Sequence, residues 1–320
     1  MKLSALMLFS AAVMMLCSCK DGADALLPKS GGRSYEVLVV AKNDTDRSLM
    51  DSLLTQNVPG LPQNEPLFDV SFTDSEHLDR TAKTVRAIVF VTVDSLRFTS
   101  TKIRYEKNVW AKPQMVVYVN SPSTAALKRD IIKSGRKLTD LLTRAEINNT
   151  LSTLKRGGNW RAEKYINKVF DISMKIPTDM KSEKRGKDFI WLSDNAACGM
   201  RSICVYTYPG KALDIADFIS ARDSIMKANI PGERDGMYMQ TAAESVETTL
   251  KKEKGRTVME CRGLWEMHGD AMGGPFVALA EANPANGKIT VTEAFVYAPE
   301  MKKRNLIRQT EAALYSNFFN

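Results

Sequence analysis

The chain has 320 residues, of which 44% are hydrophobic and 26% are charged, a balance typical of globular proteins. This composition excludes a fibrous or wholly disordered chain, and the length favours two domains. The net charge of +8 is spread along the sequence, so it indicates that anionic partners are tolerated and does not predict nucleic-acid binding.

The N-terminus has the pattern of a bacterial lipoprotein signal. Lys2 supplies a positive start, Leu3–Leu16 is an apolar run, and the small Ser18 stands directly before Cys19. A membrane-spanning helix needs about 20 apolar residues, and this run is shorter. We therefore predict a signal peptide at residues 1–18 and an acylated Cys19.

This signal also predicts where the protein works. Acyl chains on Cys19 would anchor it to a membrane of the cell envelope, which we expect to be the outer membrane, facing either the periplasm or the exterior. Residues 19–32 are polar and contain few apolar side chains, so we predict a tether. Nucleic acid is not an expected partner of an exported chain.

Residues 33–156 are predicted to form an α/β domain. Three continuous β-branched runs are typical of strands covered on both faces, namely Val37–Val40, Ile88–Val91 and Met115–Val119. A further strand is expected at Phe68–Phe72. Helical spacing follows near Leu49–Leu54, and again from a predicted N-cap and first helical residue at Ser121-Pro122 to about Lys155. Gly157-Gly158 ends that pattern and marks the predicted domain boundary.

Residues 159–320 are predicted to form an α+β domain with a mainly antiparallel sheet. The expected strands are short alternating segments: Asp171–Ile176, Phe189–Leu192, Ile203–Tyr208, Val258–Met267, Phe276–Ala280 and Ile289–Tyr297. Asn286-Gly287 is a strong hairpin signal between the last two. One helix is expected over Ile215–Ile225 and another at the C-terminus over Leu306–Phe318, each with one apolar face.

Four segments carry a resemblance to a known family. They are residues 27–32 after the lipobox, the turn at 58–63, Tyr105–Ala111, and above all Gly263–Phe276 with the sequence GLWEMHGDAMGGPF. Together they resemble a family of uncharacterised lipoproteins from Bacteroidetes, along nearly the whole mature chain. The resemblance implies a source and a location, and that family has no established activity to carry over.

The densest group of reactive side chains is Glu266, His268 and Asp270. Residues two apart share one face of a strand, so these three could converge as metal ligands or as an acid and base pair. Alternatively, they form an outward polar face opposite buried Cys261 and Trp265. We favour the polar face, and expect no catalytic metal and no cofactor.

Three cysteines remain in the predicted domains, at positions 198, 204 and 261. Export permits disulfides, and Cys198–Cys204 and Cys204–Cys261 are the candidate pairs. Three buried thiols are the equally weighted alternative.

The long helical segment near residue 140 carries a basic stripe. Its members fall at helical spacing and are Arg129, Lys133, Arg136, Lys137 and Arg144. The stripe could meet anionic lipid headgroups or acidic glycans, but a solvated helix face is the interpretation we favour.

These features favour a non-enzymatic envelope protein that binds a protein or glycan partner. The sequence lacks the common signatures of serine hydrolases, zinc proteases and phosphate-binding loops. The alternative is an envelope hydrolase or metal-dependent enzyme that uses Glu266, His268 and Asp270.

Overall fold

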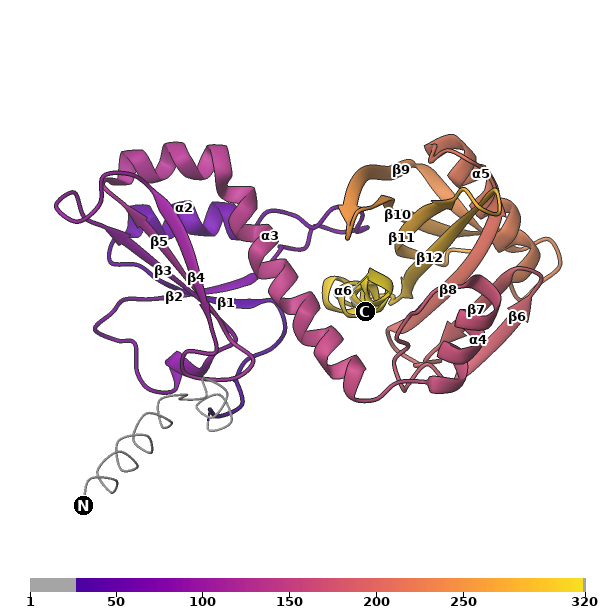
Figure 1. Cartoon of the computed structure of the whole chain (residues 1–320), viewed down its shortest axis with the longest axis horizontal. Coiled ribbons are helices and arrows are strands. Elements are labelled where there is room, and N and C mark those ends of the chain that lie inside the picture. Colours follow the sequence, from indigo (N-terminus) through magenta and orange to yellow (C-terminus); the bar gives the residue numbers. More distant parts are fainter. Residues whose placement is uncertain (1–26, 319–320) are drawn as a thin grey trace, which may run out of the picture. The chain divides into compact units, whose positions relative to one another are not determined.

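The computed structural model describes residues 27–318, and the predicted signal peptide and Cys19 lie outside them. The described chain divides into two compact units. The N-terminal unit comprises the chain up to Met50 and Val70–Lys133, and the C-terminal unit comprises Asp51–Asp69 and the chain from Ser134 onward. Figure 1 shows the two sheets at the centre of these units. The boundary at Gly157-Gly158 stays a prediction.

The N-terminal unit contains a mixed five-stranded sheet with the strand order β2-β1-β3-β5-β4. Its strands are β1 (Glu36–Val40), β2 (Asp69–Thr73), β3 (Ala87–Val93), β4 (Lys102–Lys107) and β5 (Met115–Ser121). β1, β3 and β5 are parallel, as their continuous apolar runs predicted, whereas β4 is antiparallel to β5 and was not predicted. All six β4 residues are exposed, so the strand lacks the apolar pattern that sequence reasoning uses.

An aromatic ladder crosses one face of this sheet. The Phe90 and Tyr118 rings stack with centroids 5.5 Å apart, and the Arg104 guanidinium lies 4.8 Å from the Tyr118 ring. Trp110 lies 6.1 Å from Phe90 on its other side. These side chains bury one another across β3, β5 and β4, which leaves each of the three rings only half-buried.

Both helices predicted for residues 33–156 are present, as α2 (Asp44–Leu54) and α3 (Thr124–Arg156). The predicted cap of α3 at Ser121 is wrong by two residues. Ser121 is still part of β5, and the hydroxyl that accepts a backbone N–H, from Ala126 at 3.2 Å, belongs to Ser123. Pro122 therefore lies between strand and cap. A three-residue 3₁₀ turn, η1 (Ala82–Thr84), precedes β3.

The C-terminal unit is built on a seven-stranded antiparallel sheet with the strand order β6-β7-β8-β12-β11-β10-β9. The strands are β6 (Ser182–Gly186), β7 (Phe189–Ser193), β8 (Met200–Pro209), β9 (Tyr238–Glu253), β10 (Arg256–His268), β11 (Gly273–Asn283) and β12 (Lys288–Tyr297). The helices are α4 (Trp160–Phe170), α5 (Ile215–Asn229) and α6 (Arg304–Tyr315), and a short 3₁₀ turn, η2 (Ser316–Phe318), follows α6. The predicted α/β and antiparallel α+β regions are both confirmed, as is the hairpin at Asn286-Gly287.

The strand predicted at Asp171–Ile176 is wrong. Asp171 adopts a left-handed conformation, with a φ of 54°, and ends α4. The following backbone N–H groups bond to side chains: Ser173 to Asn317, Lys175 to Ser316, and Ile176 to Glu163. With these donors satisfied by side chains, the segment has no need of a partner strand.

Hydrophobic cores lie on both faces of the large sheet. On one face the sheet packs against α4 and α6, through residues such as Ile166 and Leu314. On the other it packs against α5, through Phe218 and Met226. Because strand residues alternate, each central strand sends neighbouring side chains into different cores.

Residues 55–69, here called the strap, dock onto this unit at the start of α6. Lys303 at the N-cap of α6 makes no side-chain cap. Instead the buried Glu65 carboxylate accepts the backbone N–H of Lys303 at 2.6 Å and of Arg304 at 3.0 Å. A negative group suits a helix N-terminus, and this one comes from far away in the sequence. Gly60 of the strap has a φ of +73°, and a Cβ there would lie 3.0 Å from the Cβ of Arg262.

Glu65→Ala should therefore destabilise the protein. Its removal leaves two buried backbone donors without an acceptor, which we expect to lower the free energy of unfolding by about 2 kcal/mol. Urea unfolding followed by circular dichroism measures the change. Glu76→Ala, in an exposed loop, is the matched control and should change stability by less than about 0.5 kcal/mol. Equal effects of the two substitutions would contradict the role of Glu65.

Candidate functional site

The predicted Glu266, His268 and Asp270 group lies at the exposed end of β10 and in the turn that follows. All three residues are exposed, whereas Cys261 and Trp265 are buried, as strand alternation predicted. Glu266 accepts a hydrogen bond from Gln240 Nε2 at 2.6 Å. The structure does not bring the three side chains together: among residues 27–318, no group of three or more His, Cys, Asp or Glu residues could hold a metal ion.

The glycine-rich bend after His268 has a packing role. The Trp265 indole donates its Nε1–H to the Val296 carbonyl oxygen at 3.2 Å. Gly274 lies beside both groups, and a Cβ at this position would stand 2.0 Å from the same oxygen. The indole of Trp265 thus reaches from β10 across Gly274 of β11 to β12, and this packing explains Gly274 without a ligand.

The basic stripe on α3 is exposed along its whole length. Three of its members face carboxylates: Arg129 lies 3.2 Å from Asp130, Arg136 lies 4.0 Å from Asp140, and Arg144 lies 3.3 Å from Glu253. Lys133 and Lys137 complete the stripe. Pairing with acids reduces the net charge that it offers to a headgroup, so the structure gives no support for a dedicated anion site there.

Cys198, Cys204 and Cys261 are free thiols, so neither candidate disulfide forms in this fold. Cys204 pairs with Glu293 on β12, which pairs with Ala278 on β11, which pairs with Cys261 on β10. Three strand spacings of about 4.8 Å separate the two thiols, too far for a bond. Burial, together with Glu293, raises the pKa of Cys204 well above its usual value and that of Cys261 to about 12, which makes both thiols inert.

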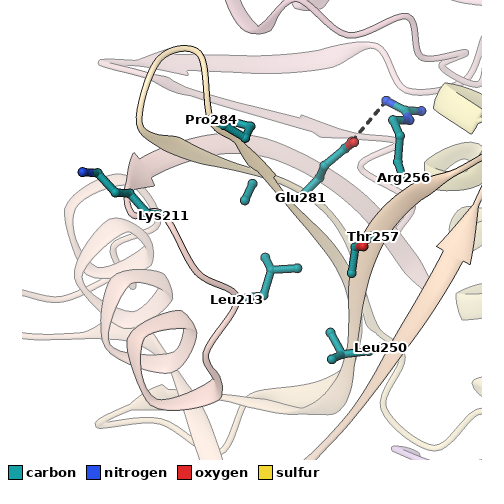
Figure 2. Close-up of a pocket in the computed structure, with 8 residues that line it drawn as sticks. Lys211, Leu213, Leu250, Arg256, Thr257, Glu281 and Pro284 are labelled. Carbon is teal, nitrogen blue, oxygen red and sulfur yellow. Dashed lines mark hydrogen bonds and ion pairs between the residues drawn. The ribbon is translucent and has the colours of Figure 1, made fainter.

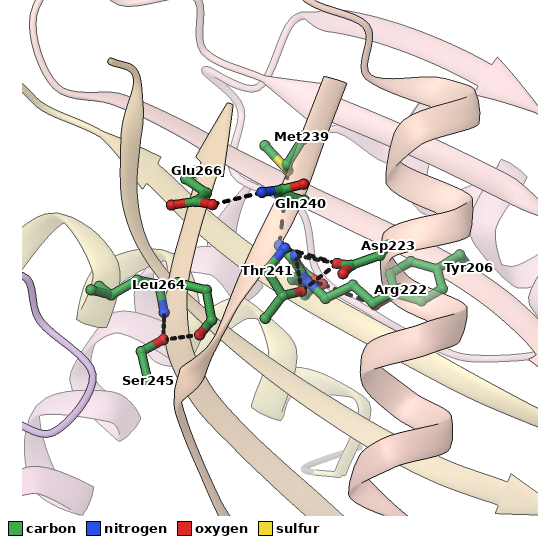
Figure 3. A network of polar contacts seen from close by, with 11 residues as sticks. Tyr206, Arg222, Asp223, Met239, Gln240, Thr241, Ser245, Leu264 and Glu266 are labelled. Atoms are coloured by element: carbon green, nitrogen blue, oxygen red, sulfur yellow. Dashed lines mark hydrogen bonds and ion pairs between the residues drawn. The ribbon is translucent and has the colours of Figure 1, made fainter. Parts of the chain in front are cut away.

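Sequence reasoning missed a buried polar network between α5 and the sheet, shown in Figure 3. Arg222 and Glu293 are both fully buried, and Arg222 Nη2 lies 2.7 Å from Glu293 Oε1. Tyr206 donates its hydroxyl to Glu293 at 2.9 Å, and Arg222 donates to Thr241 at 2.8 Å and lies 4.2 Å from the Phe276 ring. Burial alone would lower the pKa of Arg222, but the facing Glu293 raises it. The pair joins α5 to the sheet and is structural.

A second network joins β10 to α6 on the opposite face. Arg262 contacts both Glu260, at 3.0 Å, and Glu311. Glu260 also accepts from Lys251 at 2.6 Å and from the Tyr315 hydroxyl at 2.5 Å. Burial alone would raise the pKa of Glu260, but Arg262, Lys251 and these hydrogen bonds outweigh it and lower the value to about 2. Three groups, Arg262, Lys251 and Tyr315, hold this carboxylate, so its role is structural.

An open hollow of about 590 Å³ lies at one end of the large sheet, shown in Figure 2. Its walls come from the loop before α5, from β9 and β10, and from the end of β11 with the turn that follows it. The lining side chains are Lys211, Leu213, Leu250, Arg256, Thr257, Glu281, Ala282 and Pro284. Its volume falls within the range of small-molecule sites. No single sequence motif marks it, because it is assembled from four separate segments.

The hollow has an apolar lining and charged edges. Leu213 and Ala282 pack against the core on the α5 face, and Leu250 is 65% exposed. Glu281, the carboxylate of the lining, lies 3.1 Å from Arg256. Burial raises the pKa of Glu281 above its usual value, and the opposing effect of Arg256 is smaller. This pairing leaves Lys211 as a cation at the opposite edge (Figure 2).

Two family models match the chain. One is a domain of unknown function (DUF8532) over residues 30–155, and the other is a domain of unknown function (DUF4837) over residues 159–316. A search of curated proteins found no match. Among solved structures, the lipid transfer and protein localization domain of human StarD13 is similar over 41% of this chain and 88% of that chain, with 8% identity and a TM-score of 0.21. Similarity at that level carries no argument.

The helices between residues 27 and 318 include none that combines the length and the hydropathy required to cross a bilayer.

The Arg222–Glu293 pair generates a stability prediction. Glu293→Gln leaves the Arg222 charge buried without its counter-ion, so we expect a loss of about 3 to 5 kcal/mol in the free energy of unfolding. The double variant Arg222→Met with Glu293→Leu removes both charges and should recover most of that loss. Chemical unfolding of the wild type, of Glu293→Gln and of the double variant measures the loss and its recovery. A double variant no more stable than Glu293→Gln would contradict this account.

The lowered pKa of Glu260 predicts that the stability of the fold depends on pH. Its carboxyl has a folded pKa of about 2, below the ordinary value of 4.5. A lowered acid pKa stabilises the folded state above the unfolded value, and this contribution is lost as the pH falls from about 4.5 to 2. We expect the loss to be on the order of 3 kcal/mol. Unfolding of the wild type and of Glu260→Gln between pH 6 and 2 measures it. Parallel pH profiles for the two proteins would show that Glu260 does not contribute.

Proposed function

We propose that this protein is a lipid-anchored component of the cell envelope that works by binding and not by catalysis. Acyl chains on Cys19 would hold it at a membrane, which we take to be the outer membrane, and residues 19–32 would tether the folded units to that anchor. The sequence pattern Leu16-Cys17-Ser18-Cys19 supports the anchor.

The hollow in the C-terminal unit is the observation that carries the binding function. It is of ligand size, its lining is apolar, and its carboxylate is paired with Arg256. Elsewhere, the buried carboxylates of Glu293 and Glu260 belong to ion-pair networks that join α5 and α6 to the sheet. A protein or glycan partner at the envelope is compatible with this proposal, and the hollow adds a site for a small ligand.

The anchor is tested by Cys19→Ala. Acyl chains supply membrane affinity at about 0.8 kcal/mol per buried CH₂ group, so the variant should lose fatty-acid labelling and no longer fractionate with membranes. Metabolic labelling followed by membrane fractionation measures both. Cys17→Ala is the matched control and should label normally. Labelling that persists in Cys19→Ala would refute the anchor.

The binding function is tested against the enzyme alternative by metal content. We expect protein purified without chelator to contain no stoichiometric zinc, manganese or iron. His268→Ala should change the free energy of unfolding by no more than about 0.5 kcal/mol, because His268 is an exposed strand residue. A stoichiometric metal that is lost in His268→Ala would overturn the proposal in favour of the enzyme.

A further inference from the structure

The hollow at the end of the large sheet combines an apolar floor with basic edges. We propose that it binds an anionic amphiphile, a molecule with an aliphatic part and a carboxylate or phosphate head. The inference specifies a ligand class for the binding function proposed above and rests on it.

The apolar part of the site comes from three segments. Leu213 precedes α5, Leu250 lies on β9, and Ala282 lies near the end of β11. Leu213 and Ala282 continue the core on the α5 face out to the surface. Leu250 is 65% exposed although its strand neighbour Met259 is buried. An aliphatic group in the hollow would take Leu250 out of water, which is the favourable change that apolar burial provides.

The charge of the site selects an anion. Lys211 stands at one edge of the lining, and Lys252 reaches the lining by donating to the Thr257 hydroxyl at 2.5 Å. The Glu281 carboxylate is already paired with Arg256. Asp214, next to Leu213, is also engaged: it accepts the backbone N–H groups of Ala216 and Asp217 and caps α5. Lys211 and Lys252 have no ion-pair partner among the described residues, so these two cations are left to face an anionic group in the hollow.

The test is a binding titration on the mature chain carrying Cys19→Ser, so that no acyl chain of its own competes. The probe is 11-(dansylamino)undecanoic acid, followed by its fluorescence, and the comparison is its neutral methyl ester. We expect the acid to bind roughly tenfold or more tightly than the ester, since a hydrogen bond to a charged group contributes that much. Competition by dodecanoic acid and by dodecyl phosphate then distinguishes a carboxylate from a phosphate head, and inorganic phosphate alone should not compete.

The site is located with variants in the same background. Leu250→Asp puts a like charge beside the ligand, Ala282→Trp fills the hollow while keeping it apolar, and Lys211→Glu reverses a cation; each should weaken binding roughly tenfold or more. Leu96→Asp is the matched control, because Leu96 is 97% exposed in the N-terminal unit, and it should bind like the parent. Thermal unfolding of each variant confirms that it is folded.

Three results would overturn the inference: equal binding of acid and ester, equal effects of Leu250→Asp and Leu96→Asp, or displacement of the probe by inorganic phosphate alone. If these occur while Cys19 is acylated and no metal is found, the ligand class is wrong and the envelope function stands. If Cys19→Ala still labels, the anchor is wrong, and the titration still decides the hollow.

Discussion

The ion pair between Arg222 and Glu293 is the interaction on which the C-terminal unit depends most. Glu293 lies on β12, in the middle of the sheet, where its carboxylate is removed from water completely. A buried charge is tolerated only with a partner and further hydrogen bonds, and these come from Arg222 on α5 and Tyr206 on β8. The position of α5 on this face is therefore tied to one residue of the central strand.

The opposite face follows the same design with different residues. Glu260 and Arg262 point from β10 toward Glu311 and Tyr315 of α6, and the strap brings Glu65 to the start of that helix. Each face thus has an apolar core and one charged network that fixes a helix on it. Such networks cost desolvation energy, and their benefit is a single arrangement of helix on sheet.

The position of α5 on the sheet also determines where the hollow lies. α5 covers its face of the sheet only in part. Next to the N-terminus of α5, the apolar surface of Leu213, Leu250 and Ala282 stays open to solvent. The reactive side chains of Glu266, His268 and Asp270 lie at the exposed end of β10 and in the turn that follows it, and they do not converge. The open apolar surface of the hollow, with Lys211 at its edge, is the arrangement on which the proposed binding function rests.

The sequence by itself determined the elements whose patterns are local. The β-branched runs of β1, β3 and β5, the alternation along β10 and the Asn286-Gly287 turn were all predictable, because each depends on neighbours within a few residues. The tertiary structure decided what depends on distant partners. The 171–176 segment is not a strand because side chains of Glu163, Ser316 and Asn317 take its donors, and β4 is a strand only because β5 offers an edge. The roles of Glu65 and Glu293 also depend on distant residues, up to 239 positions away in the case of Glu65. The lining of the hollow is assembled in the same way from separate segments, and no local sequence pattern predicts such contacts.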